Sequence, residues 1–275
     1  MDERYKKTNI VLGEGSYKTV SKATDMEEGK EVAYNELKIK KYEQEHQAGS
    51  SFSKEIALLK NIHHPNIIQI LDYWFKDDNF IFITELMTGG TMKDYISKMG
   101  AINDKLIKKW AKQILNGIHY LHTQNIIHRD IKSENVFVNA SAGEIKIGDL
   151  GISKEKSVKM YTMVGTLNFM SREMFEGEGY DESVDIYAFG MTLIHMATAR
   201  TPYVECVDAS AVKKNVLSGI PPDALNLVEN RCLKHLIVSC LATPTNRFTA
   251  EECLSHHFFN DEKPHICLPD KCCLI

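Results

Sequence analysis

Short hydrophobic runs of strand length dominate the first third of the chain. Charged and turn-forming residues separate them, and this spacing predicts β-strands. The runs lie at residues 9–13, 18–25, 30–37, 67–75 and 79–86. One helix is expected among them, because Phe52, Ile56 and Leu59 recur at the spacing of a helix face.

Helical patterns dominate after the break at Gly89 and Gly90. One apolar stripe runs through Leu106, Trp110, Ile114, Ile118 and Leu121. Residues 183–199 are apolar on most sides, which predicts a helix buried inside a lobe.

Together these patterns predict an α+β, two-lobed fold. A small β-rich lobe with one main helix spans residues 1–87, and a larger α-helical lobe spans residues 88–260. Residues 261–275 form a C-terminal tail. The cleft between the two lobes is where we expect a ligand to bind.

Composition narrows the function classes. The chain has 275 residues, 43% hydrophobic and 25% charged, which is typical of a globular protein with a full core. A formal net charge of −4 argues against nucleic acid as a partner. The charged start lacks a signal-peptide core, and no apolar run reaches transmembrane length. The seven cysteines lack zinc-site spacing, so we expect a cytoplasmic protein with reduced thiols.

The most specific motif is HRDIKSENV, at residues 128–136. Asp130 is placed to accept a proton from an attacking hydroxyl, and Lys132 to neutralise a transferring phosphoryl group. Asn135, with Asp149 in the later DLG sequence, supplies oxygen ligands for Mg²⁺. The pattern is typical of phosphoryl transfer.

A glycine-rich turn, LGEGSYKTV, occupies residues 12–20. A dinucleotide-binding oxidoreductase would need a helix after such a turn, whereas strand-like sequence follows here. A glycine hairpin folded over phosphates is the better interpretation.

These motifs, in this order, resemble those of the eukaryotic protein kinases of the serine/threonine class over residues 8–260. The resemblance implies the bilobal kinase fold with ATP and Mg²⁺ as cofactors. It places Glu55 on the small-lobe helix and pairs Arg247 with Glu173. It assigns ATP contacts to Leu12, Gly13, Gly15, Lys18, Val20, Ala33, Thr84, Glu85, Met87 and Phe137.

The lysine expected on the third strand of a kinase is missing, because Asn35 occupies its position. Strand alternation turns Lys38 to the opposite face, whereas Lys18 shares the cleft face with Val20. A lysine in the glycine loop and none on the strand resembles the With-No-Lysine (WNK) kinases. That family has cysteine at the strand position, and Ser171 begins an SRE sequence where kinases have APE. Lys18 is therefore expected to be the phosphate-binding lysine.

The same resemblance implies regulation. Thr162 aligns with an activating phosphorylation site on the activation segment. An inhibitory chloride would bind the backbone N–H groups of Leu150 and Ile152, with Ile70 and Phe82 lining the site. Separately, the final residues CCLI have the C-a-a-X form, so Cys272 is a candidate for prenylation and a lipid anchor.

The sequence thus predicts an active serine/threonine kinase with Lys18, Glu55, Asp130 and Lys132 as catalytic residues. The alternative is a pseudokinase scaffold that binds ATP or partners without phosphotransfer. The resemblance implies a protein substrate, with Ste20-like kinases as candidates. The chain would act as a monomer or as a transient dimer for trans-autophosphorylation.

Overall fold

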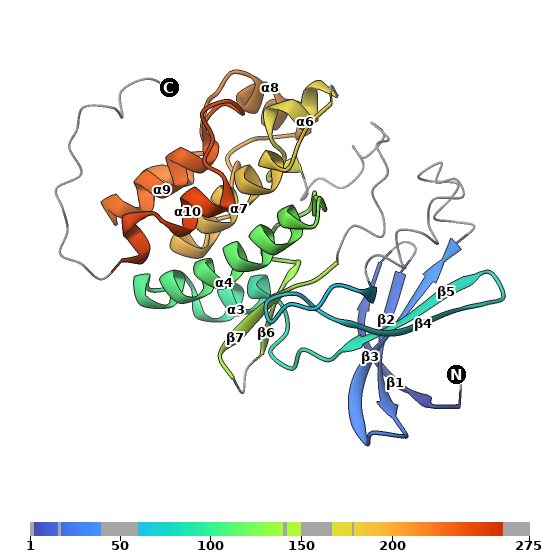
Figure 1. Ribbon diagram of the computed structural model, residues 1–275. Helices are drawn as coiled ribbons and strands as arrows, with labels where there is room; N and C mark the ends of the chain where they lie inside the picture. The colour runs from blue at the N-terminus through green and yellow to red at the C-terminus, as the bar shows by residue number, and fades with distance from the viewer. Residues whose placement is uncertain are drawn as a thin grey trace.

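The computed structural model describes residues 3–15, 18–39, 60–139, 142–149, 167–177 and 179–260. A β-sheet forms one end of the molecule and a group of helices forms the other (Figure 1). The predicted two-lobed α+β fold is confirmed. The helix expected near Phe52 lies outside the described residues.

The small lobe is a five-stranded antiparallel sheet with the order β1-β2-β3-β5-β4. The strands are β1 (Tyr5–Glu14), β2 (Lys18–Asp25), β3 (Lys30–Lys38), β4 (Ile70–Lys76) and β5 (Asn79–Glu85). All five predicted runs contribute a strand. β3 lies in the middle of the sheet, with four consecutive buried residues from Val32 to Asn35. The position that lacks the lysine is therefore at the centre of the small lobe.

The large lobe is built around one buried helix. Thirteen of the sixteen residues of α7 (Ser183–Thr198) are buried, as its all-round hydrophobicity predicted. Among the described residues, this lobe also contains the helices α3 (Met92–Met99), α4 (Asp104–Thr123), α6 (Arg172–Glu176), α8 (Ala209–Leu217), α9 (Arg231–Leu241) and α10 (Ala250–Leu254), with 3-10 turns η1 (Asp223–Leu227) and η2 (His257–Phe259).

The stripe predicted on α4 packs into the core as expected, apart from its first member. Trp110, Ile114, Ile118 and Leu121 are buried, whereas Leu106 in the first turn is only half-buried. α4 begins where the Asn103 side chain accepts a hydrogen bond from the Leu106 N–H at 3.0 Å. Within the described residues, no helix has both the length and the hydrophobicity to cross a bilayer.

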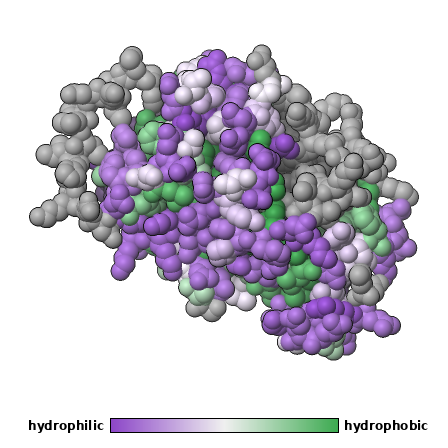
Figure 2. Space-filling model, in the orientation of Figure 1, coloured by the Kyte–Doolittle hydropathy of each residue, from purple (hydrophilic) through white to green (hydrophobic). Residues whose placement is uncertain are grey.

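A short hairpin of β6 (Val136–Asn139) and β7 (Glu144–Ile147) packs against α4 on the side that faces the sheet (Figure 1). Hydrophobic side chains gather where the sheet meets the helical lobe, within a largely hydrophilic surface (Figure 2). The candidate metal ligands flank this hairpin, since Asn135 comes directly before β6 and Asp149 shortly after β7. The hairpin therefore brings both of them to this junction.

Helix α7 packs closely on α9 at Gly190. A Cβ atom there would lie 2.8 Å from Cys240 Cβ and 3.1 Å from Leu241 Cδ2. We expect Gly190→Ala to lower the free energy of unfolding by about 1–3 kcal/mol through overpacking. Alanine's higher helix propensity alone would predict the opposite sign. Urea denaturation measures the change. Gly179→Ala is the control, since a Cβ at Gly179 meets nothing within 4 Å. Equal stability of the two variants would contradict the expectation.

Candidate active site in the cleft between the lobes

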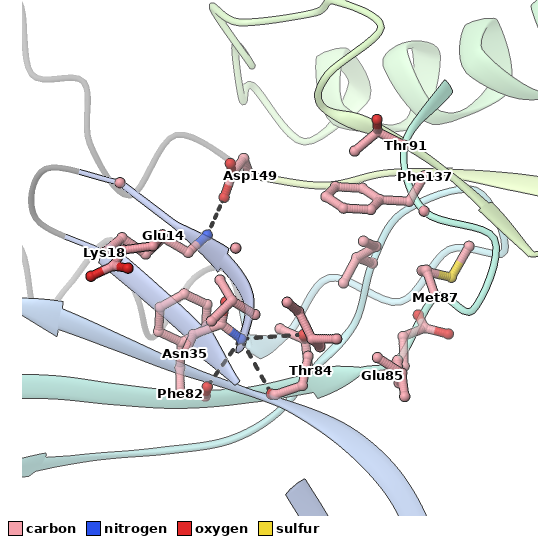
Figure 3. A pocket seen from close by; sticks show the side chains of 18 of the residues that line it. Glu14, Lys18, Asn35, Phe82, Thr84, Glu85, Met87, Thr91, Phe137 and Asp149 are labelled. Carbon is pink, nitrogen blue, oxygen red and sulfur yellow. Dashed lines mark hydrogen bonds and ion pairs between the residues drawn. The ribbon is translucent and has the colours of Figure 1, made fainter. Parts of the chain in front are cut away.

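A cavity of about 460 Å³ lies between the lobes (Figure 3). All ten residues predicted to contact ATP line it, together with Asp149. Val20 and Ala33 come from the sheet, Phe137 from β6, Glu85 from the end of β5, and Met87 from the connection between the lobes. The cavity is therefore built from both lobes, with Lys18 and Asp149 at the end away from Glu85 and Met87 (Figure 3).

Lys18 reaches into this cavity from the start of β2 (Figure 3). Its ammonium forms an ion pair with the carboxylate of Asp149, which comes from the opposite lobe. The same ammonium lies 5.4 Å from the centroid of the Phe82 ring. A positive charge therefore stands at the polar end of the cavity.

Asn35 does not replace that charge. Its side-chain amide donates to the backbone oxygens of Ala33 and Phe82 at 3.2 and 3.3 Å, and to the Thr84 hydroxyl at 3.4 Å. Asn35 is 4% exposed and is held against the sheet. Lys38 is exposed, pairs in register with Asn79, and does not line the cavity. Of the three positions considered from the sequence, only position 18 brings an ammonium into the cleft.

The HRDIKSENV segment brings its chemical groups together. The Nζ of Lys132 lies 3.1 Å from Asp130 Oδ2. The amide nitrogen of Asn135 donates to the backbone oxygen and to Oδ2 of Asp130, both at 2.8 Å. Asp130 is thus held between the Lys132 ammonium and the Asn135 amide, whose N–H groups its side chain accepts.

This loop is anchored by the buried carboxylate of Asp185 on α7. Asp185 accepts the backbone N–H groups of His128 and Arg129 at 2.8 and 2.7 Å, and its Oδ2 lies 3.0 Å from His122 Nε2. Arg129 has a φ of 67°, in the left-handed region that non-glycine residues rarely adopt. The fully buried carboxylate compensates the cost of this strained backbone.

The donor atoms fit a divalent cation. The side-chain nitrogen of Asn135 donates hydrogen bonds to Asp130, so the side-chain amide oxygen is turned away from that residue. The Gly148 N–H donates to the Asn135 backbone oxygen at 2.8 Å and so links the Asn135 and Asp149 segments. A Cβ at Gly148 would lie 2.6 Å from the Phe137 ring, so only glycine allows this approach. A carboxylate and an amide oxygen are ligands that Mg²⁺ accepts.

The Lys18 ammonium lowers the pKa of the Asp149 carboxyl, whose side chain is 45% exposed. Asp149 is therefore ionised at neutral pH, as a metal ligand must be.

Several predicted residues lie outside the described residues: Glu55, Leu150, Ile152, Thr162 and Cys272. The two described members of the expected chloride site, Ile70 and Phe82, both line the central cavity. The predicted pair between Arg247 and Glu173 is present, with one guanidinium nitrogen 3.3 Å from Glu173 Oε2. The altered SRE sequence thus retains its ion pair.

Two further residues that the sequence motifs did not single out also line the cavity. Thr91 and Asp94 line it and form the capping box that begins α3. The signal was present, because Thr-x-x-Asp is the capping-box pattern.

Comparison with known proteins identifies the family to which this chain belongs. The model of the protein kinase domain matches residues 6–259. The chain belongs to the protein kinase family. This kinase is 46% identical over 271 residues to the serine/threonine-protein kinase pkpA of Phycomyces blakesleeanus, covering 98% of this chain and 43% of that protein. It is 39% identical over 270 residues to the serine/threonine-protein kinase WNK4 of Homo sapiens, covering 95% of this chain and 22% of that protein.

These relatives place the kinase in the serine/threonine class, as the sequence predicted. The chain spans less than half the length of either of them. A crystal structure of Rad53 in complex with AMP-PNP superposes with a TM-score of 0.82 at 24% identity, covering 94% of this chain and 66% of that one. That likeness supports the fold.

The Lys18–Asp149 ion pair predicts that the Asp149 carboxyl has a different pKa when Lys18 is replaced. Because the folded-state pKa of Asp149 is lowered, the pair stabilises the fold above the unfolded carboxyl pKa of about 4, and this stabilisation is lost as pH falls through the folded-state value. We expect Lys18→Met to raise the pKa of Asp149, followed by NMR of its carboxyl carbon. Lys22→Met is the control, since Lys22 pairs with Glu31 on the sheet. An unchanged Asp149 titration in Lys18→Met would rule out this electrostatic coupling.

Proposed function

We propose that this kinase transfers the γ-phosphoryl group of ATP to serine or threonine hydroxyls of proteins, with Lys18 as its phosphate-binding lysine. The observation that carries the proposal is the Lys18 ammonium inside the cleft, beside Asp149. The exposed position of Lys38 and the buried, hydrogen-bonded Asn35 support the same assignment.

Each group has a role that follows from its position. Adenine would bind between Val20 and Ala33 on one side and Phe137 on the other, at the connection that contains Glu85 and Met87. The triphosphate would then extend toward Lys18, whose ammonium lies within reach of both a phosphate and Asp149.

On the acceptor side, Asp130 would take the hydroxyl proton. Lys132, 3.1 Å from it, would offset the charge that develops on the transferring group. Asn135 and Asp149 would hold Mg²⁺, which neutralises phosphate charge when bound. Most of the rate enhancement would come from positioning and charge stabilisation.

A pseudokinase scaffold is the second candidate. Asn35 at the strand position and the SRE sequence favour it. Against it stand Asp130, Asn135 and Asp149, whose side chains offer the chemistry of an active site.

Phosphate transfer from labelled MgATP to the kinase itself and to a basic protein distinguishes the two. We expect Lys18→Met and Asp130→Ala each to lower the rate by at least about a hundredfold, since each removes a group that stabilises the transition state. Lys38→Met is the matched control and should retain wild-type activity.

Activity retained in Lys18→Met but lost in Lys38→Met would show that the phosphate-binding lysine was assigned wrongly. An inactive wild type that still binds ATP would favour the scaffold.

Regulation at this site is a further part of the proposal. Phosphate on Thr162 would order the activation segment through Arg129. Chloride beside Ile70 and Phe82 would lie near the Lys18 ammonium and would compete with phosphate for it.

Ste20-like kinases are the proposed substrates, by analogy with the WNK family.

Autophosphorylation in chloride and in gluconate, at equal ionic strength, tests this regulation. We expect chloride to lower the rate relative to gluconate, and the phosphate to map to Thr162 by mass spectrometry. Thr162→Ala should lower activity toward the basic protein by more than Ser157→Ala, which removes a weaker candidate phosphorylation site in the same segment. Equal rates in the two salts would remove chloride from the proposal, and full activity of Thr162→Ala would remove the phosphorylation site.

A further inference from the structure

The aromatic face of Phe82 lies next to the lysine that the proposed function depends on. The Nζ of Lys18 is 5.4 Å from the centroid of the Phe82 ring, within the range of a cation–π interaction. Phe82 is 4% exposed and the Lys18 side chain is 23% exposed. Because both groups are largely removed from water, the attraction is stronger here than at a surface site.

Asn35 explains why the ring face is open to Lys18. Asn35 and Phe82 are direct neighbours across β3 and β5, and Val20 pairs with Asn35 from the other side. Lys18 lies two residues before Val20, so it projects from the same face of β2. Since the short Asn35 side chain bonds back to the Ala33 and Phe82 backbone, it leaves the ring to the lysine of the neighbouring strand.

The ring itself is held in place. It stacks on the Phe80 ring, with centroids 5.5 Å apart and planes inclined by 21°. Phe80 is fully buried and in turn packs against Tyr73 and Phe75, at 6.0 and 5.1 Å between centroids. The face presented to Lys18 is thus part of the rigid core of the small lobe.

We infer that Phe82 is a positioning residue for Lys18, whose ring holds the ammonium in the cleft before the nucleotide binds. A free lysine side chain loses considerable rotamer freedom when it is immobilised on a phosphate. The ring reduces that cost by confining the chain in advance. The Phe82 ring carries no net charge, whereas Asp149 is also a candidate ligand of Mg²⁺. The ring therefore holds Lys18 without competing for the metal. This inference rests on the proposed role of Lys18 as the phosphate-binding lysine.

Progressive fluorination of the Phe82 ring tests the inference, because fluorine withdraws electrons from the face with little change in volume. Mono-, di- and trifluorophenylalanine are introduced at position 82 of the full chain, in chloride-free buffer. We expect kcat/KM for ATP to fall stepwise, reaching about five- to tenfold with three fluorines. ATP affinity should fall in parallel, while adenosine affinity stays constant, because adenosine has no phosphate for Lys18 to contact.

Two controls separate electronics from packing. The same fluorinated residues at Phe189, fully buried in α7, should leave both affinities unchanged. In a Lys18→Met background, fluorination at position 82 should have no further effect on ATP affinity. If the fluorinated chains do not fold, Phe82→Tyr should retain ATP affinity relative to adenosine, and Phe82→Leu should lose it.

A flat fluorination series in an active wild type, or equal losses for ATP and adenosine, would overturn the role of Phe82. If Lys18→Met remains fully active, the proposed role of Lys18 fails instead, whatever the fluorinated series shows. The binding comparison still tests Phe82 if the wild type is an inactive scaffold, because it does not depend on turnover.

Discussion

The active site depends on one buried carboxylate. Asp185 lies on the central helix of the large lobe, fully removed from water, and an isolated charge there would be costly. It is compensated by two backbone N–H groups, of His128 and Arg129, and by the His122 ring. Those bonds are available only if the catalytic loop adopts the left-handed backbone at Arg129. The hydrogen bonds that compensate the buried charge therefore also hold the strained loop in this conformation.

The second feature is the cation that faces Asp149 from the small lobe, which the proposed function needs. Most of the residues that could supply it are on the sheet, where a side chain's direction is set by its position in the strand. With Asn35 at the central position, the charge comes from the neighbouring strand. Lys18 meets this need because β2 and β3 pair so that Lys18 lies opposite Leu37, diagonal to Asn35. In the proposed role of Lys18, the short Asn35 side chain leaves the face of the Phe82 ring open to the ammonium.

The ion pair between Arg247 and Glu173 shows which part of the SRE sequence matters for the fold. The guanidinium also donates to the Ala242 and Ser183 backbone oxygens, and it is almost completely buried. Only the glutamate of the three residues makes this contact. Ser171 and Arg172 differ from the kinase pattern without disturbing the pair.

The sequence by itself determined the fold class, the strand positions and the buried helix, and it predicted the residues of the candidate catalytic loop. These follow from local periodicity and from residues only a few positions apart, such as Asp130, Lys132 and Asn135. Strand alternation also separated Lys18 from Lys38, because it is a local property of each strand. The sequence did not place Phe82 beneath the Lys18 ammonium, nor show how Asn35 bonds back to the sheet. Only the tertiary structure decided those contacts, because they depend on the register between β2, β3 and β5, and so on pairings between distant parts of the chain.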